Sequence, residues 1–452
     1  MTSLEFNFSN YYKTKTMKIL KFGGTSVGTP ERIQNLAQIV QSEEPCIVVL
    51  SAMAGTTNAL VEITELLYKG DNENSLIKIE VLEQSYISRV NELFTSDEYL
   101  NKGLELISSH FIYIRNFVHK TFTQLQEKAV LAQGELISTA MFHYHLSENN
   151  IDSVLLPALN FMRIDKDGEP DSYYIQENLK REICRTPQDK LFITQGYICR
   201  NAYGEVDNLH RGGSDYSASL IGAAISADEV QIWTDIDGFH NNDPRFVEQT
   251  QAISELSFDE AAELAYFGAK IMHPASVLPC KLNNIPVRLK NTLSPCDVGT
   301  LISNKLERKR IKAVAAKDGI TAVKIKSGRM LLAYGFLRKI FEVFEIYKTP
   351  IDMITTSEVA VSLTIDDTSR LEEIENELKK FGTVEIDKNQ SIICIVGDFI
   401  SEAAGSAKLV LEALDKIPLR MISYGGSSHN ISVLVDQENK VEALKSLNKL
   451  FS

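Results

Sequence analysis

Short runs of apolar and β-branched residues alternate with longer helical stretches from residue 18 to about residue 300, and this alternation constrains the fold most. The apolar runs stand at residues 45–50, 153–156, 191–194, 230–233 and 285–289. The helical stretches include residues 30–42, 75–95, 103–127 and 213–226. Apolar strands separated by helices predict a mostly parallel sheet that helices cover on both faces. Ligands of such sheets bind at the carboxyl ends of the strands.

The chain changes character after residue 305, where two units of similar design follow one another. Strand-like segments at residues 352–356 and 361–366 recur at 420–424 and 431–436, with offsets of 68 and 70 residues. This internal repeat predicts two copies of one strand–helix–strand–strand–helix unit, and residues 382–386 add a closing strand to the first copy. We expect residues 311–315 to supply the corresponding strand of the second copy, which would nest one repeat inside the other.

Length and charge limit the class of protein. A chain of 452 residues suits two to four domains, at roughly 150 residues each. The formal net charge of −13 argues against binding to nucleic acid or to an anionic membrane. The six cysteines have no CxxC spacing, which indicates reduced thiols in a cytoplasmic protein rather than a disulfide framework, and no metal site is predicted.

Neither a membrane span nor a secretory signal is expected. No run of about 18 apolar residues occurs, and residues 1–16 lack the apolar segment of a signal peptide. Met17 stands directly before the first strand. Residues 1–16 are therefore either an extension of the mature protein or a stretch upstream of a start at Met17.

The first strand ends in a glycine-rich turn suited to an anion. Residues 18–29 read KILKFGGTSVGT, so that Lys21 precedes the pair Gly23 and Gly24. Glycines let backbone N–H groups approach phosphate oxygens, a following helix N-terminus favours negative charge, and the lysine adds a mobile positive charge. It is not a Walker A loop, because Thr29 stands where the lysine should follow. The segment predicts a polyphosphate site of another design; the alternative is an ordinary turn with an exposed lysine.

A second glycine-rich segment, LHRGGSDYSA, occupies residues 209–218. The planar guanidinium of Arg211 suits a carboxylate or a phosphate. Asp215, near the start of the next helix, is placed to orient Lys21 or a bound magnesium ion. The alternative is a helix cap followed by a turn.

Weaker signals come from single carboxylates. Asp235 and Asp237 follow a strand, as at a nucleotide site or in an ordinary turn. Glu135 offers a carboxylate to an ammonium group, although surface glutamates are usually just solvated.

No Ser-His-Asp or Cys-His arrangement stands out. A carboxylate phosphate acceptor is ionised at pH 7 and needs no general base, so alignment and charge neutralisation suffice.

Five motifs, in this order along the chain, resemble those of aspartate kinases in the amino acid kinase superfamily. They are KFGGTS at 21–26, SAMAGTTN at 51–58, GELIST at 134–139, RGGSDY at 211–216 and WTD at 233–235. The likeness runs from about residue 18 to 452. Residues 335–337 and 351–358 look like the lysine-sensitive branch, of the monofunctional type. The resemblance implies an α/β amino acid kinase fold, with a mostly parallel central sheet sandwiched by helices, followed by two βαββαβ (ferredoxin-like) ACT domains.

The expected domains follow from the motifs and the repeat. They are an N-terminal extension at 1–17, a catalytic domain at 18–304, a linker and strand at 305–318, and ACT domains at 319–388 and 389–452. The resemblance also implies a homodimer or larger assembly formed through the ACT domains.

The implied activity is ATP-dependent phosphorylation of the side-chain carboxylate of L-aspartate to 4-phospho-L-aspartate, with Mg²⁺ carried mainly by the nucleotide. This step opens the synthesis of lysine, threonine, methionine and isoleucine. The catalytic residues implied by the family are Lys21 and Asp215. Those implied for aspartate are Ser51, Thr57, Glu135, Tyr197, Arg211 and Ser214. Those implied for ATP are Lys21, Gly23, Gly24, Thr234, Asp235, His240, Arg245 and Lys270.

Feedback inhibition by L-lysine is implied at a site between two subunits. Its residues are Met330, Ala333, Phe336, Leu337, Ile351, Asp352, Ser357 and Glu358. The acidic residues Asp352 and Glu358 supply the charge that an ammonium group needs.

Some positions depart from the family pattern and leave alternatives open. They are the segment Pro157-Ala158-Leu159, the segment 207–210, Tyr197, His240 and Ala333. Asp207 and His240 bear on nucleotide affinity, and Ala333 on the effector. Two other functions stay open: an amino-acid-binding regulatory protein with an inert kinase domain, and a sibling kinase for glutamate, acetylglutamate, carbamate or UMP. The motifs retained around Lys21 and Glu135 favour an active aspartate kinase.

Overall fold

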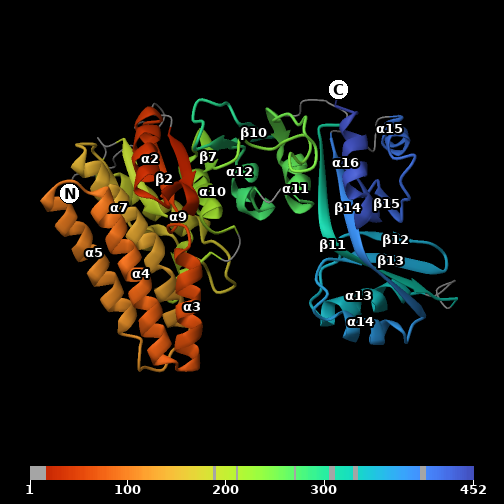
Figure 1. The fold of residues 1–452 in the computed structure, drawn as a ribbon, viewed down its shortest axis with the longest axis horizontal. Coiled ribbons are helices and arrows are strands. Elements are labelled where there is room, and N and C mark those ends of the chain that lie inside the picture. The colour runs from red at the N-terminus through yellow and green to blue at the C-terminus, as the bar shows by residue number, and fades with distance from the viewer. Residues whose placement is uncertain are drawn as a thin grey trace, which may run out of the picture. The chain divides into compact units, whose positions relative to one another are not determined.

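The computed structural model describes residues 17–186, 190–209, 212–268, 271–304, 311–328, 334–397 and 404–451. The chain divides into two compact units, each with a sheet of its own (Figure 1). The first unit contains Met1–Gly238 and Met272–Asn304, and the second contains Phe239–Ile271 and Lys305–Ser452. Residues 239–271, which we expected within the catalytic domain, therefore group with the C-terminal repeats. Residues 1–16 lie outside the described residues.

The sheet of the first unit is mostly parallel, as the sequence predicted. Its strands lie in the order β3 (Val154–Leu156), β4 (Leu191–Gln195), β2 (Cys46–Leu50), β1 (Lys18–Phe22), β7 (Glu229–Thr234), β9 (Val287–Asn291) and β10 (Thr300–Ser303). The pairs from β3 to β9 are parallel, and β10 pairs antiparallel with β9. The carboxyl ends of β1, β2, β4 and β7 therefore meet at one edge of the sheet.

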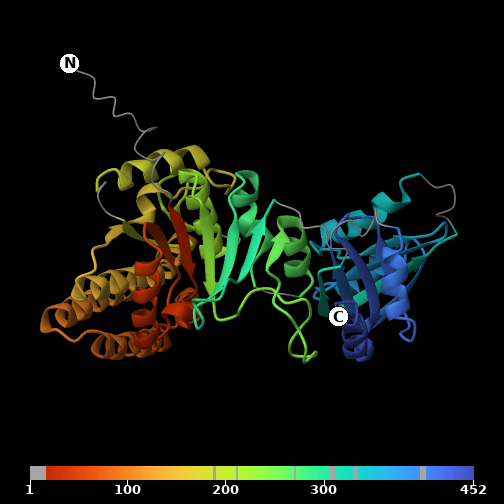
Figure 2. The same cartoon turned by 90° about the horizontal axis from the view of Figure 1, so that it is seen from above.

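Helices cover both faces of this sheet (Figures 1 and 2). The helices of this unit are α2 (Pro30–Ser42), α3 (Thr56–Lys69), α4 (Asn72–Leu93), α5 (Asp97–Arg115), α6 (Gln124–Leu131), α7 (Gln133–Glu148), α8 (Ala158–Phe161), α9 (Ser172–Ile183), α10 (Gly213–Ile225) and α12 (Leu278–Leu282). Leu20 and Phe22 of β1 belong to one apolar core with residues of α2, α3, α4, α5 and α7. The intervening Lys21 faces α10, where its ammonium group meets Asp215. Alternation along β1 thus gives one face to the core and the other to the site.

The predicted single helix at 103–127 is wrong, because the chain breaks it into α5 and α6. His119 adopts a left-handed backbone conformation, with φ of 67°. Thr123 then forms a capping box with Gln126, which satisfies backbone N–H groups at the start of α6. Local capping chemistry ends one helix and starts another where the sequence pattern predicted continuity.

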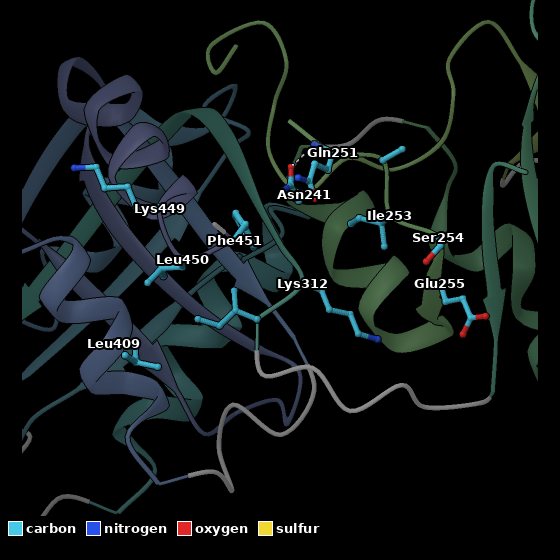
Figure 3. A pocket seen from close by; sticks show the side chains of 12 residues that line it. Asn241, Gln251, Ile253, Ser254, Glu255, Lys312, Leu409, Lys449, Leu450 and Phe451 are labelled. Carbon is cyan, nitrogen blue, oxygen red and sulfur yellow. Dashed lines mark hydrogen bonds between the residues drawn. The ribbon is translucent and has the colours of Figure 1, made fainter. Parts of the chain in front are cut away.

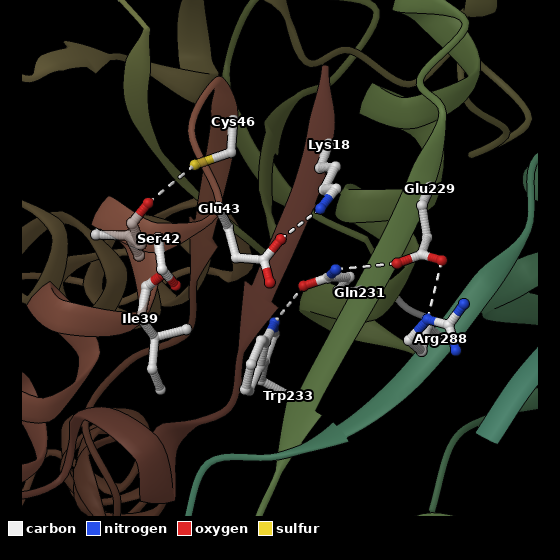
Figure 4. Close-up of polar contacts among 10 residues, drawn as sticks. Lys18, Ile39, Ser42, Glu43, Cys46, Glu229, Gln231, Trp233 and Arg288 are labelled. Carbon is white, nitrogen blue, oxygen red and sulfur yellow. Dashed lines mark hydrogen bonds and ion pairs between the residues drawn. The ribbon is translucent and has the colours of Figure 1, made fainter. Parts of the chain in front are cut away.

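A chain of hydrogen bonds fixes the indole of Trp233 on β7 (Figure 4). Trp233 Nε1 donates to Gln231 Oε1, and Gln231 Nε2 donates to Glu229 Oε1, each at 2.9 Å. Arg288 Nε on β9 donates to the other oxygen of Glu229, also at 2.9 Å. The indole stacks on Phe22, with ring centres 5.6 Å apart. These contacts hold the ends of β1 and β7 in fixed relation, directly beside Lys21 and Thr234.

The second unit contains an antiparallel sheet shared by the two repeats. Its strands lie in the order β12 (Ile354–Thr356), β13 (Ala360–Ile365), β11 (Ala313–Lys326), β14 (Thr383–Val396), β16 (Asn430–Asp436) and β15 (Met421–Tyr424). One core packs against α13 (Phe336–Ile346) and α14 (Leu371–Leu378). Another packs against α15 (Ser406–Ala413) and α16 (Lys440–Asn448).

The expected pairing of residues 311–315 with the second repeat is confirmed from Ala313 onward. Ala313 pairs with Val396 and Lys317 pairs with Ile392, in the half of β14 that also pairs with β16. The same two strands continue into the first repeat, beyond a break in register after Lys317. The positions 318/319 and 388/389, where we expected boundaries, therefore lie inside β11 and β14.

Within the second unit, the short strand β8 (Glu255–Ser257) leads into α11 (Phe258–Tyr266), which is anchored by a buried ion pair. Glu260 Oε2 accepts from Ser257 N at 2.7 Å, as part of a capping box, and from Lys312 Nζ at 2.9 Å. The side chains of Lys312 and Glu260 are 4% and 0% exposed. No helix in the described ranges is long and apolar enough to cross a membrane.

We predict that Lys312→Met lowers the free energy of unfolding by about 3–5 kcal/mol, because it leaves Glu260 as an unpaired buried charge. Adding Glu260→Gln should restore most of this loss, since glutamine keeps the capping contact without the charge. Urea unfolding of the full chain measures both effects. Lys379→Met, which removes the exposed Lys379–Glu375 pair, serves as a control with an expected change under about 0.5 kcal/mol. Equal stability of the parent and Lys312→Met would contradict the prediction.

Candidate active site

The residues predicted to act on substrate gather at the carboxyl edge of the first unit's sheet. Lys21 is the penultimate residue of β1, Ser51 follows β2, and Tyr197 follows β4. Ser214 and Asp215 lie in the first turn of α10. Contacts between these side chains join segments that lie far apart in the sequence.

An ion pair joins β1 to α10. Lys21 Nζ lies 2.6 Å from Asp215 Oδ1, and the two side chains are only 12% and 14% exposed. Asp215 stands in the first helical turn, where the partial positive charge of the helix end stabilises a carboxylate. Of the two roles that the sequence left open for Asp215, the structure displays the orientation of Lys21.

The glycine turn packs closely on the segment that follows β2. Ala54 N donates to Gly24 O at 3.0 Å. A Cβ atom on Gly24 would lie 2.7 Å from Ala52 O, so a side chain there would force the two segments apart. The helix that follows is the short 3₁₀ turn η1 (Gly24–Val27), and α2 begins only at Pro30 behind the cap Thr29. The helix expected at residues 30–42 is confirmed as α2, and η1 adds one 3₁₀ turn between the glycines and this helix.

Two serines connect β2 to α10. Ser51 Oγ donates to Ser214 Oγ at 2.9 Å, and Ser138 Oγ on α7 donates to Ser51 O at 2.8 Å. A Cβ atom on Gly196 would lie 2.4 Å from Ser214 Cβ, so only glycine allows this approach of β4 to α10. Three segments thereby converge on one point.

Glu135 is a buried carboxylate, so the solvated surface glutamate considered from the sequence is excluded. It is 4% exposed at the start of α7, and its Oε1 accepts from Ala52 N at 3.1 Å. Burial raises the pKa of Glu135 to about 7. Burial, with the charge of Glu135, also raises the pKa of Tyr197 to about 12, so the phenol stays neutral. No cation is among the described contacts of Glu135. The ammonium group of a ligand would provide a positively charged partner for its carboxylate.

Tyr197 adopts a strained backbone conformation beside these groups. Its φ is 65°, which is uncommon for a residue with a side chain. Ser217 Oγ accepts from Tyr197 N, and Tyr197 O accepts from Leu209 N, each at 2.8 Å. Gly212 and Gly213 also have positive φ angles, of 70° and 49°. The surrounding hydrogen bonds hold this turn against its local preference.

Lys128 is a polar neighbour that sequence reasoning missed. Its Nζ lies 3.2 Å from Asp207 Oδ1 and 2.8 Å from Asn208 Oδ1. Asp207, a departure from the family pattern, therefore has its charge compensated. Nothing in one sequence links residues some 80 positions apart.

Gln195, which the sequence also did not indicate, holds the segment 157–159, another departure from the family pattern. Its Oε1 accepts from Ala158 N, and its Nε2 donates to Thr139 Oγ1, each at 2.8 Å. Thr139 Oγ1 in turn donates to Glu135 O at 2.8 Å. The segment around Ala158 is thereby hydrogen-bonded to the helix that carries Glu135.

The predicted nucleotide residues fall into separate groups. Thr234 and Asp235 belong to the first unit, where Thr234 Oγ1 donates to Asp235 Oδ1 at 3.2 Å. His240 and Arg245 belong to the second unit. Arg245 is exposed and bonds Asp243, with Nη2 and Oδ2 2.7 Å apart. Among the aspartate residues, Thr57 is exposed on α3. Arg211 and Lys270 lie outside the described residues.

The predicted effector residues belong to the second unit. Phe336 and Leu337 start α13. Ile351 and Asp352 precede β12, and Ser357 and Glu358 form the turn between β12 and β13. The carboxylate of Asp352 accepts from Lys317 Nζ and from the Tyr266 hydroxyl. Met330 and Ala333 lie outside the described residues.

The second unit also contains a separate cavity of about 650 Å³ (Figure 3). Gln251, Lys312 and Phe451 are among its lining residues. None of the predicted catalytic, nucleotide or effector residues lines it. The described part of the chain contains no group of three or more His, Cys, Asp or Glu side chains placed to hold a metal ion.

Comparison with known proteins finds relatives that are aspartokinases. The pattern of the amino acid kinase family matches residues 16–291, and an ACT-domain pattern matches residues 393–451. The chain is 34% identical over 443 residues to lysine-sensitive aspartokinase 3 of Escherichia coli, covering 95% of this chain and 98% of that protein. It is 31% identical to the chloroplastic aspartokinase 2 of Arabidopsis thaliana, over 96% of this chain and 84% of that protein.

Solved structures of aspartokinases have a similar fold over nearly the whole chain. Escherichia coli aspartokinase III in complex with lysine and aspartate has a TM-score of 0.82 and 33% identity, over 96% of this chain and 99% of that one. Aspartokinase III in complex with aspartate and ADP has a TM-score of 0.80 and 32% identity, over 96% and 100%.

We predict that Glu135→Gln stabilises the unliganded protein at pH 8 but not at pH 4. The raised pKa of Glu135 means that the folded state binds more protons than the unfolded state between pH 4.5 and about 7. The free energy of unfolding therefore falls as pH rises through this window, by at most roughly 3 kcal/mol. Glutamine avoids that loss. Urea unfolding at both pH values tests this, with the exposed Glu31→Gln as a control, and equal gains at both pH values would contradict it.

Proposed function

The chain belongs to the aspartokinases of the amino acid kinase family, and we propose that it transfers the terminal phosphoryl group of ATP to the side-chain carboxylate of L-aspartate. The product is 4-phospho-L-aspartate. The observation that carries this proposal is the Lys21–Asp215 ion pair beside the glycine turn, at the strand edge where Ser51 and Ser214 also meet. An oriented ammonium group and close-packed backbone suit a transferring phosphoryl group.

Chemistry at this site requires charge neutralisation rather than a base. The acceptor carboxylate is already ionised at neutral pH, so no proton has to be removed. Lys21 supplies positive charge where negative charge spreads over the phosphoryl oxygens in a loose transition state. Asp215 keeps the ammonium group aimed, because the side chain of lysine is otherwise flexible. Mg²⁺ would arrive with the nucleotide and neutralise phosphate oxygens.

Aspartate carries both signs of charge, and the site offers a partner for its ammonium group. Glu135 would hold that group, and binding would favour the ionised form of a carboxylate whose pKa burial raises to about 7. Arg211 is assigned to a substrate carboxylate by its guanidinium chemistry. Glu135 thus favours an amino acid over acetylglutamate, carbamate or UMP, which lack an ammonium group.

Regulation by an amino acid is the second part of the proposal. The ACT-domain match and the similarity to the lysine-sensitive aspartokinase 3 of Escherichia coli support L-lysine as the effector. Exposed apolar side chains on the edge strands β12 and β15, such as Ile354, Ile422 and Tyr424, support assembly through this sheet. Six free cysteines are consistent with a reducing, cytoplasmic location.

The test is ADP release with ATP, Mg²⁺ and a panel of acceptors: aspartate, glutamate, acetylglutamate, carbamate and UMP. We expect release only with aspartate. Release with another acceptor alone would favour a sibling kinase, and release with none would favour an inert kinase domain.

Lys21→Ala should lower turnover by about 10³-fold, the scale of lost transition-state charge stabilisation. Lys18→Ala is the matched control, because Lys18 lies on the same strand but pairs with Glu43, away from the site. Its turnover should stay within about twofold of the parent. A loss below tenfold for Lys21→Ala would contradict the role assigned to Lys21.

A further inference from the structure

Four side chains of the second unit form a connected polar cluster at the end of α11. They are Tyr266, the last residue of α11, Lys317 in β11, Asp352 before β12 and Asp366 after β13. Lys317 Nζ lies 2.9 Å from Asp352 Oδ1 and 2.8 Å from Asp366 Oδ2. The Tyr266 hydroxyl donates to Asp352 Oδ1 at 2.8 Å, and Lys317 Nζ lies 4.6 Å from the centre of the Tyr266 ring. Burial and this hydrogen bond raise the pKa of Tyr266 to about 12, so it remains a donor.

This cluster has one carboxylate more than it has cations. The side chain of Asp352 is 1% exposed, and both of its donors use Oδ1. Its Oδ2 has no hydrogen-bond partner among the residues that the structure describes. A buried carboxylate oxygen without a donor is costly. The cluster therefore has both the charge and the vacant acceptor for one further ammonium group.

One carboxylate joins that acceptor to α11. The torsion that turns an aspartate carboxylate about its own axis is soft. An ammonium group that binds Oδ2 would draw the carboxylate toward itself and weaken the bond between Oδ1 and the Tyr266 hydroxyl. Ligand binding at Asp352 would then change a hydrogen bond made by the last residue of α11.

The end of α11 is packed closely against β11, so a change at Tyr266 would alter its position. A Cβ atom on Gly268 would lie 2.3 Å from Ala316 O, so the turn after α11 rests directly on the backbone of β11 next to Lys317. Asn430 Nδ2 on β16 donates to Glu263 Oε2 at 2.6 Å and tethers the same helix elsewhere. Lys270, assigned to ATP by family resemblance, follows Tyr266 by four positions in the sequence.

We propose that Tyr266 is a positioning residue that transmits ligand binding at Asp352 to the end of α11, four positions before the residue that family resemblance assigns to ATP. This inference rests on the proposed function and deepens it, because it names the residue through which an amino-acid effector changes nucleotide binding. The coupling is reciprocal: whatever lysine does to nucleotide affinity, the nucleotide does to lysine affinity.

The experiment measures L-lysine binding to the full chain by calorimetry, with and without a saturating, non-hydrolysable ATP analogue and Mg²⁺. The ratio of the two dissociation constants is the coupling factor, expected to be at least about fivefold for the parent. Tyr266→Phe removes only the hydroxyl and keeps the ring over Lys317. We expect its coupling factor to fall to within about twofold of unity, with kcat and KM for aspartate in the absence of lysine unchanged.

Asn430→Ala is the matched control, because it cuts another tether of α11 without touching Asp352. It should keep the coupling factor of the parent. Parent-like coupling in Tyr266→Phe, or an equal loss in Asn430→Ala, would overturn the proposal. So would a change confined to lysine affinity with coupling intact, since Tyr266 would then only shape the ligand site. Failure of the parent to bind lysine would overturn it too, while ADP release judges the kinase activity separately.

Discussion

The arrangement of the catalytic edge depends on one charge pair that spans the space between a central strand and a helix. Lys21 and Asp215 are both mostly buried. Each compensates the charge of the other, because burying an isolated charge costs free energy. The pair works only because backbones come close on either side of it. Gly24 rests against Ala52, and Gly196 rests against Ser214, at distances that leave no room for a Cβ atom. Steric constraint and charge therefore fix the same point.

A further acidic residue, Glu135, lies at the same edge of the sheet as the ion pair. Glu135 is buried without a cation of its own among the contacts described, and burial raises its pKa into the neutral range. Lys21 suits anionic oxygens, and Glu135 suits a cation. A small zwitterion that also accepts a phosphoryl group would meet both requirements. In the proposed reaction, this separation of charge, rather than any nucleophile or base, is the contribution of the site.

Much of the architecture could be predicted because apolar runs and glycine turns act locally. The strands around Val48, Ile193 and Ile232 were expected from their apolar character and lie in the parallel sheet. The single helix expected at 103–127 failed because the cap at Thr123 outweighs a helical pattern. The grouping of residues 239–271 with the repeats was also not anticipated, since contacts of α11 with β11 and β16 connect distant segments.

The candidate site shows the same division. Lys21 and Asp215 were found from motifs, and their contact agrees with the orienting role considered for Asp215. The partners Lys128 and Gln195 were not found, because a contact across tens of residues leaves no trace in one sequence. The burial of Glu135 was missed for a related reason. Its surroundings come from the loop after β2, and no pattern near residue 135 records them.

The two long strands β11 and β14 have a consequence for how the repeats behave as a pair. Each strand is 14 residues long and contributes hydrogen bonds to both halves of the sheet. Neither repeat can be excised, or unfold alone, without leaving half of a ladder unpaired in the other. The duplicated halves thus share two continuous strands. A displacement imposed on one repeat reaches the other through covalent backbone, across the break in register between Lys317 and Ala322, with no separate linker between them.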